Sequence, residues 1–369
     1  MNDARVWENE GSGKPGPVAL KALSKTKAAT IYEVAQRAGV SIATVSRALR
    51  GSDLVTEATR ARVHAAVQEL HFTPNRLGRS LAEGRHAANG IVFPDLVGPY
   101  YAEVVLGYEE AASDLGSSVL ILATRRRPDA ADAVVELAAR VDGIVVMGNT
   151  VDDEVVRGIA ASGVPVVLLA RDPMPGVDTI RTRNRGTAVT LTAHLVAHGH
   201  RHVAFLGDPV GSPDVAGRYA GFAAALRAAG LPVPAPVPCD LDLAAGEAAA
   251  VALLGDRRPD AIVCANDELA LGVHLAAEAA GLRVPDDLAV TGWDDVLAAR
   301  FAGLTTVRQP MRELGATAAR WLHQRIQERT ADPAGSTDAV RRAARRRVLS
   351  TRLVVRRSCG THPHPGGNS

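Results

Sequence analysis

The residues with the clearest chemical pattern lie between Thr30 and Leu49, where small, polar and basic side chains recur at helical spacing. One short helix in this stretch would carry four of them on its outer face, together with the apolar Ile42: Ala43, Thr44, Ser46 and Arg47. Small side chains at the start of a helix allow close approach to a DNA major groove, and an arginine one turn later can read a base edge. The pattern therefore predicts contact with DNA.

The elements that would position this face are two short helices joined by a tight turn. Thr30 and Glu33 form a capping-box pattern at the start of the first helix. Gly39 can adopt the left-handed conformation that ends a helix, and Ser41 is suited to cap the second one. A helix, a glycine-containing turn and a second helix are the helix-turn-helix pattern.

Two short helices alone would also fit an ordinary helical hairpin in a globular core. A third helix is predicted over Thr56–Leu70, and the sequence then reads FTPNRLGRSLA from Phe72 to Ala82. The whole run from Thr30 to Ala82 resembles the DNA-binding headpiece and hinge of the lactose/galactose repressor (LacI/GalR) family of bacterial transcription regulators. The resemblance continues along the chain, over roughly residues 29–328 and the last strand.

The resemblance implies roles for individual headpiece residues. Ile42, Ala43 and Arg47 would reach base edges, beside the DNA-facing cap residue Ser41. Ile42 and Ala43 have no hydrogen-bonding groups, so their contacts would be apolar, for instance with a thymine methyl group. Phosphates would be held by four other residues: Tyr32, Thr44, Ser46 and Asn75.

The segment from Asn75 to Ala82 resembles the hinge helix of the family. A helix this short is unstable in water and orders only when a partner such as DNA stabilises it. Arg76 would offset phosphate charge, and Leu81 would wedge into a minor-groove base step. The alternative for Leu81 is a core leucine of a linker helix.

Composition and charge limit the possible classes of protein. The chain has 369 residues, of which 47% are hydrophobic, which indicates two or three globular domains. Ten of its lysines and arginines, against five acidic residues, lie between Lys25 and Arg85, so a basic end precedes a near-neutral body. Three widely spaced cysteines, no membrane span and no signal-peptide core predict a cytoplasmic protein without contact with a membrane.

From Asn89 onward, short apolar runs alternate with helical stretches, which is typical of buried parallel strands with crossover helices. The predicted strands begin at Ile91, Ser118, Gly143, Val164, His202, Ala261 and Leu288. The pattern restarts after Val164–Leu169, so an α/β fold with two doubly wound lobes and a cleft between them is expected. This body resembles the periplasmic-binding-protein-like sensor of the family, in which the chain crosses between lobes three times, here near 181–185, 308–311 and 328–348.

Ligands of doubly wound folds bind beyond the carboxyl ends of the strands. By resemblance to the family, the ligand-binding candidates at these positions are Tyr100, Tyr101, Arg171, Arg218, Asn266 and Asp294. Aromatic rings stack on the apolar face of a sugar, and a guanidinium offers several donors to hydroxyl or carboxylate groups. The alternatives are packing aromatics for the tyrosines, a helix cap for Asn266 and a surface arginine for Arg218.

Three departures from the family pattern concern the ligand. Gly98 stands where sugar binders often have asparagine, Arg183 replaces an aspartate, and Ala170 replaces the aspartate before Arg171. The sequence leaves both a sugar and, given Arg171 and Arg218, an anionic ligand open.

Other chemistries have weaker patterns. His194 and His198 have metal-binding spacing, but no cysteine or carboxylate completes a site. The glycines at 11–16 match a dinucleotide pattern without the strand and helix it needs. No phosphate loop, nucleophile elbow or catalytic carboxylate pair is present, since Asp294 and Asp295 are adjacent and point different ways. We therefore expect no enzyme, metal or cofactor.

The sequence thus predicts a homodimeric repressor that binds double-stranded operator DNA and a small-molecule effector. The expected effector is a sugar or sugar derivative. The expected domains are an extension (1–28), headpiece (29–74), hinge and linker (75–87), ligand-binding and dimerisation body (88–358) and tail (359–369). Lobe 1 would comprise 88–182 and 310–328, and lobe 2 would comprise 183–308 and 348–356. The arginine-rich stretch 329–347 is expected to be a solvated linker rather than a phosphate contact. A sugar-binding uptake or sensing protein without DNA binding is the alternative function.

Overall fold

The computed structural model describes residues 29–49, 51–72, 86–256, 259–331 and 343–360. The chain divides into two units, 1–83 and 84–369, which are described separately. Three predicted DNA-contacting residues lie outside the described ranges: Asn75, Arg76 and Leu81.

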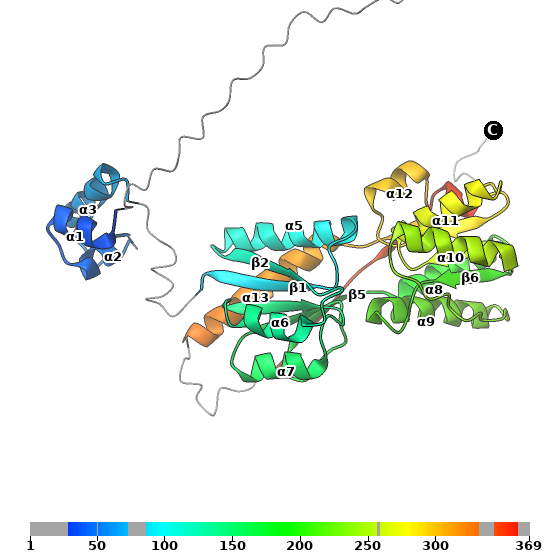
Figure 1. Ribbon diagram of the computed structural model, residues 1–369, viewed down its shortest axis with the longest axis horizontal. Helices are drawn as coiled ribbons and strands as arrows, with labels where there is room; N and C mark the ends of the chain where they lie inside the picture. Colours follow the sequence, from blue (N-terminus) through cyan, green and yellow to red (C-terminus); the bar gives the residue numbers. More distant parts are fainter. Residues whose placement is uncertain (1–28, 50, 73–85, 257–258, 332–342, 361–369) are drawn as a thin grey trace, which may run out of the picture. The chain divides into compact units, whose positions relative to one another are not determined.

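The first unit contains the three predicted helices: α1 (Ile31–Ala38), α2 (Ile42–Leu49) and α3 (Glu57–Glu69) (Figure 1). The predicted capping box is formed, because the Thr30 N–H donates to the Glu33 carboxylate at 2.6 Å and the Thr30 hydroxyl accepts from the Glu33 N–H at 3.4 Å. Gly39 ends α1 with a φ of +64°. The helices share a small core: Val34, Ala35, Ala38, Val45, Ala48, Val55, Val63, Ala66 and Phe72.

The second unit has two lobes, each built on a parallel sheet. The sheet of lobe 1 has the order β10–β5–β4–β3–β1–β2. Its strands are β1 (Ala88–Phe93), β2 (Ser118–Ala123), β3 (Gly143–Met147), β4 (Val166–Leu169), β5 (Asp178–Thr182) and β10 (Arg346–Leu349). One face is covered by α5 (Pro99–Asp114) and α13 (Met311–Ala331), and the other by α6 (Ala130–Ala138) and α7 (Asp153–Ala161) (Figure 1).

Lobe 2 has the parallel sheet β6–β7–β8 and the antiparallel pair β9–β11. Its strands are β6 (Val203–Leu206), β7 (Ala261–Cys264), β8 (Ala289–Thr291), β9 (Thr306–Arg308) and β11 (Arg352–Val354). Its helices are α8 (Arg185–Ala197), α9 (Pro213–Ala228), α10 (Leu243–Asp256), α11 (Asp267–Ala279), α12 (Leu297–Ala302) and the 3-10 helix η1 (Arg357–Cys359). The two doubly wound lobes agree with the predicted fold class.

The chain crosses between the lobes after β5, after β9 and after β10. The first two crossings lie within the predicted ranges, but the prediction of 328–348 for the third is wrong, because β10 pairs with β5 inside lobe 1. The apolar residues near the end of the chain also predict one last strand over Leu349–Val355, but the structure has two short strands there, β10 and β11, in different sheets. Thr351, between them, donates its hydroxyl to the Arg183 carbonyl at 2.6 Å and so ties two crossings together.

The end of the arginine-rich stretch is bound to lobe 1. The buried carboxylate of Asp178 accepts from Arg325 and from Arg345, each at 2.6 Å. The Arg345 guanidinium also lies over the Trp321 ring, 4.6 Å from its centroid. These contacts fix the start of β10, so Arg345 has a structural role.

Candidate functional site

The outer face of α2 is exposed as predicted. Ile42 is 39% exposed, Ala43 and Arg47 are exposed, and Thr44 and Ser46 are half-buried. Tyr32, in the first turn of α1, is 69% exposed. An exposed isoleucine and tyrosine on a small domain leave apolar surface that a partner can cover.

Ser41 is exposed but has a structural task. Its hydroxyl accepts from the Thr44 N–H at 3.1 Å and lies 2.8 Å from the Thr44 hydroxyl. Ser41 therefore caps α2 and orients Thr44. Behind this face, Arg37 of α1 pairs with Glu69 of α3 at 2.7 Å, which fixes the helices relative to each other.

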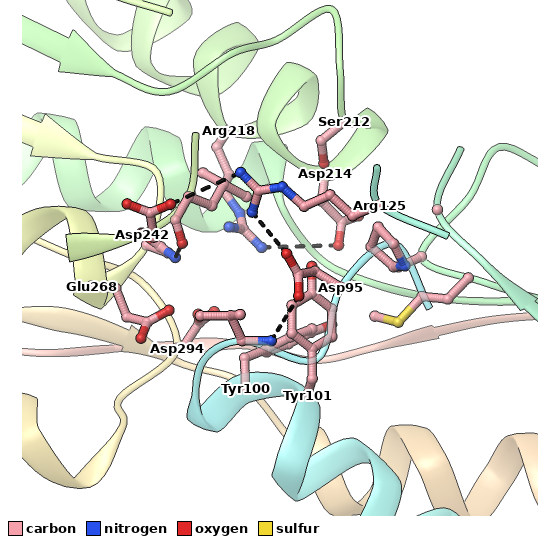
Figure 2. Close-up of a pocket in the computed structure, with 17 residues that line it drawn as sticks. Asp95, Tyr100, Tyr101, Arg125, Ser212, Asp214, Arg218, Asp242, Glu268 and Asp294 are labelled. Atoms are coloured by element: carbon pink, nitrogen blue, oxygen red, sulfur yellow. Dashed lines mark hydrogen bonds and ion pairs between the residues drawn. The ribbon is translucent and has the colours of Figure 1, made fainter. Parts of the chain in front are cut away.

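The second candidate site is a cavity of about 110 Å³ between the two lobes (Figure 2). One water needs roughly 10–15 Å³ of such volume, so this cavity holds several waters or one small molecule. It lies where the strands end and helices α5, α9 and α11 begin. Five predicted ligand-binding residues line it: Tyr100, Tyr101, Arg218, Asn266 and Asp294.

Arg218 is fixed at the cavity wall by its neighbours. Its Nε donates to the Asn184 side chain at 2.9 Å, and another guanidinium nitrogen donates to the Ala265 carbonyl at 2.6 Å. The guanidinium lies over the Trp293 ring, 4.7 Å from its centroid, and 3.9 Å from Asp214. Only 5% of Arg218 is exposed, so a ligand meets a preorganised group with few unused donors.

Asp294 is a buried carboxyl at the same wall, with 5% of its surface exposed. Its backbone has a φ of +116° and its N–H donates to the Val307 carbonyl at 2.8 Å. Burial raises the pKa of Asp294 to about 7, against the lowering effects of Arg218 and of the 2.6 Å hydrogen bond from Gln309. The group is thus partly protonated near neutral pH.

Tyr100 and Tyr101 enter the cavity from the first turn of α5 (Figure 2). Their rings pack edge to face, with centroids 5.3 Å apart. The Tyr100 hydroxyl is buried and has no hydrogen-bond partner among the described residues. Burial raises the pKa of both tyrosines, so both hydroxyls stay protonated and can donate.

The structure does not place Arg171 at the cavity, contrary to the sequence prediction. Its guanidinium is 4% exposed and donates to the carbonyls of Gly148 and Val151 at 2.9 and 2.7 Å. It also pairs with Asp153 at 2.5 Å. The Arg171 side chain turns back along lobe 1, where these acceptors satisfy its hydrogen-bond donors. Arg171 is therefore not placed to contact a ligand in the cavity.

Comparisons with known proteins find relatives of both parts of the chain. Residues 30–75 match bacterial regulatory proteins of the lacI family, and residues 192–359 match a periplasmic binding protein-like domain. Catabolite control protein A of Priestia megaterium is 33% identical over 312 residues, which cover 82% of this chain and 94% of that protein. This likeness along nearly the whole relative decides the family. The chain belongs to the LacI family of bacterial transcription regulators.

Solved structures of the LacI family share the fold. The lac repressor dimer bound to operator and an anti-inducer has a TM-score of 0.79 and 30% identity, over 91% of this chain and 100% of that one. The CelR–cellobiose complex has a TM-score of 0.66 and 31% identity, over 89% and 99%. The relatives are transcription regulators, so the chain is a regulator and not an enzyme, as the sequence predicted. The alternative function, a sugar-binding protein without DNA binding, is not favoured.

Two further observations concern this LacI-family chain. None of the described helices is long and apolar enough to cross a membrane. Among the described residues, no group of three histidine, cysteine or acidic side chains could hold a metal ion.

Asn266 combines two roles at the cavity. Its side-chain oxygen accepts from the Leu269 N–H at 2.9 Å and its amide donates to the Leu241 carbonyl at 3.1 Å, so it caps α11. The sequence alternative of a helix cap is therefore realised, while the residue still lines the cavity.

The acidic half of the cavity in this LacI-family member was not predicted from the sequence. Four carboxyl residues and one arginine were not predicted as site residues: Asp95, Asp214, Asp242, Glu268 and Arg125. Arg125 joins the lobes, since it pairs with Asp95 at 2.8 Å in lobe 1 and with Asp240 at 2.5 Å in lobe 2. Asp95 and Arg125 directly follow strands β1 and β2, and that placement was the signal that could have found them.

Proposed function

We propose that this regulator binds operator DNA through α2 and that a small molecule between the lobes controls its operator affinity. The proposal rests on the observation that one chain combines an exposed α2 face with a preorganised cavity. The likeness to a lac repressor dimer bound to operator supports DNA as the partner and a homodimer as the binding form. A two-fold operator needs two headpieces spaced by half-sites.

In the proposed complex, Ile42, Ala43 and Arg47 contact base edges in the major groove. Tyr32, Thr44 and Ser46 hold phosphates, and Ser41 positions the start of α2. Asn75, Arg76 and Leu81 keep their proposed roles in the hinge, as phosphate contacts and minor-groove wedge.

The proposed effector is a sugar or sugar derivative held in the cavity. Tyr100 and Tyr101 supply aromatic surface, and Arg218 and Asp294 supply fixed polar groups. This is the usual composition of a small-molecule site, a few placed polar groups beside apolar walls. The cellobiose complex of a similar regulator supports a carbohydrate.

A gel-shift assay of the purified full chain on fragments of its own promoter region tests the proposal. We expect specific retention, at stated salt, that a member of a panel of sugars, sugar phosphates and nucleobases weakens or strengthens. Weakening would identify an inducer and strengthening a corepressor. A folded protein that retains no fragment specifically would contradict the proposal.

A further inference from the structure

The charge of the cavity wall indicates what kind of sugar would fit. Carboxyl groups outnumber guanidinium groups by five to two among the lining residues: Asp95, Asp214, Asp242, Glu268 and Asp294 against Arg125 and Arg218. Even with Asp294 partly protonated, carboxyl groups stay in excess. In a partly buried site, such an excess of negative charge is relieved by a cation or by many hydroxyl donors, whereas an added anion would be repelled.

Both guanidinium groups are already engaged by the protein. Arg125 is bound to Asp95 (Figure 2) and to Asp240, and Arg218 donates to Asn184 and to the Ala265 carbonyl. Arg171, which the sequence predicts as a ligand contact, faces away from the cavity. An anionic ligand therefore has no unpaired guanidinium to bind.

Glu268, unlike the two arginines, has no partner among the described residues. It is half-buried at the start of α11, and no hydrogen bond or ion pair to a described residue is formed by its carboxylate. Burial and the negative charge of Asp242 raise its pKa, so the ionised form lacks compensation. A Cβ added at Gly98 would lie 2.3 Å from Glu268 Oε2, so the glycine leaves the space that this carboxylate occupies.

The remaining lining groups suit the neutral part of a sugar. The tyrosine rings provide stacking surface. The buried Tyr100 hydroxyl has no hydrogen-bond partner within the described part of the chain, and a ligand hydroxyl would supply one. Asp294, held by Gln309, can accept from further ligand donors.

We propose that the cavity selects a sugar that carries a protonated amino group, with Glu268 as the acceptor of its ammonium and Asp294 as a second acceptor. This inference rests on the proposed function, whose site it shares. It disfavours sugar acids and sugar phosphates, which the sequence alone left open.

The test compares matched sugars on the full-length protein by calorimetry, in a buffer without primary amines. The probes are glucosamine, galactosamine and mannosamine, each beside its parent hexose, with glucuronate and glucose 6-phosphate as anions. We expect at least one amine to bind roughly tenfold or more tightly than its parent, as a charge-assisted hydrogen bond implies, and the anions not to bind. An anion or parent hexose that binds more tightly than every amine would overturn the inference.

Glu268→Gln and Glu278→Gln are the matched variants. Both residues lie on α11, but Glu278 is exposed and away from the cavity. Glu268→Gln should abolish the preference for the amine over its parent hexose, and Glu278→Gln should keep the preference. An amine preference unchanged by Glu268→Gln would contradict the assignment.

The two proposals fail separately. A protein that is retained on operator DNA but binds no amine would refute the cationic-ligand inference and leave the proposed function intact. A protein that binds the amine but no promoter fragment would refute the proposed function instead.

Discussion

At the scale of single residues, Arg171 and Arg218 have different environments although the sequence predicts the same role for both. Arg218 borders the cavity, whereas two carbonyls and Asp153 hold Arg171 inside lobe 1. A side chain at a strand end has a choice of acceptors, and only the folded backbone shows which carbonyls are near. Residue type and position could therefore predict a polar site but not which arginine faces it.

Arg171→Gln tests this distinction. We expect a loss of about 2–4 kcal/mol in the free energy of unfolding, because buried carbonyls and Asp153 lose their donors. Urea unfolding measures the loss, and calorimetry should find ligand affinity nearly unchanged. Full stability with abolished ligand binding would instead restore Arg171 as a ligand contact.

Arg47→Ala tests the DNA-reading face. We expect a loss of about 1–3 kcal/mol in specific operator affinity, the usual value of a bidentate arginine–base contact. Fluorescence anisotropy with operator and with mismatched DNA separates this loss from a general phosphate effect. Arg62→Ala, which removes an exposed arginine of α3, is the control and should have a smaller effect. Equal losses on both DNAs would refute base reading by Arg47.

The pKa of Asp294 predicts how amine binding depends on pH. The groups that face it are Arg218, Asp214, Glu268, Asp267, Tyr100, Tyr101 and Gln309. A cation prefers the ionised carboxylate, so protons compete with the ligand below the pKa of about 7. Affinity should rise about fivefold from pH 6 to pH 7, where the sugar amine stays charged.

Calorimetry at the two pH values measures this dependence, and Asp294→Asn should remove it while Glu268 still binds the amine. The same pH dependence in Asp294→Asn would assign the titration to another group.

At the scale of elements, helices α5 and α13 pack unusually closely. A Cβ at Gly107 would lie 2.1 Å from the Arg312 carbonyl oxygen, and one at Gly315 would lie 2.1 Å from that of Val104. The two glycines thus face each other's backbone and allow the helices to cover one face of the lobe 1 sheet.

Gly107→Ala should therefore destabilise the protein by about 1–3 kcal/mol, because the backbones must move apart. Gly158→Ala in α7 is the control, since a Cβ there meets nothing within 4 Å. The control should be neutral or stabilising by up to about 1 kcal/mol through helix propensity. Thermal unfolding of both variants measures the contrast, and equal effects would refute the close-packing account.

Most helices and strands were predictable because the pattern of apolar residues in their own sequence is typical of a helix or of a buried strand. The strands that begin at Ile91, Gly143 and Ala261 are continuous apolar runs, and the structure has them as β1, β3 and β7. Strands β5, β9 and β10 were missed because each is short and carries arginine or aspartate, whose burial depends on partners distant in sequence. Asp178 in β5, for example, is buried only because Arg325 and Arg345 pair with it.

At the scale of the whole molecule, the cavity lies between lobes that three crossings connect. Thr182 of β5 donates to Gln309, which in turn donates to Asp294 at the cavity wall. A ligand that contacts Asp294 therefore contacts a series of hydrogen bonds that includes residues of two crossings, Thr182 and Gln309. A ligand shifts the equilibrium between two conformations when its contacts with them differ, and these hydrogen bonds at the crossings are contacts of that kind.

The acidic character of the cavity was not predictable, because its carboxyl groups come from separate segments of the chain. Asp95 and Arg125 come from lobe 1, whereas Asp214, Asp242 and Glu268 come from lobe 2. Asp95 and Arg125 add no net charge, so the acidic excess comes from lobe 2, whose carboxyl groups, Asp294 included, are far apart in sequence and meet only in the folded lobe.

The measurement that tests the central claim most directly is operator affinity with and without a saturating cavity ligand. Once an operator fragment and a ligand are known, anisotropy titrations at fixed salt give both dissociation constants. We predict that the ligand changes operator affinity by roughly 5- to 150-fold, the usual range of allosteric coupling, and that substitutions at the cavity wall reduce this change. Identical operator affinities with and without bound ligand would contradict the claim that the cavity controls DNA binding.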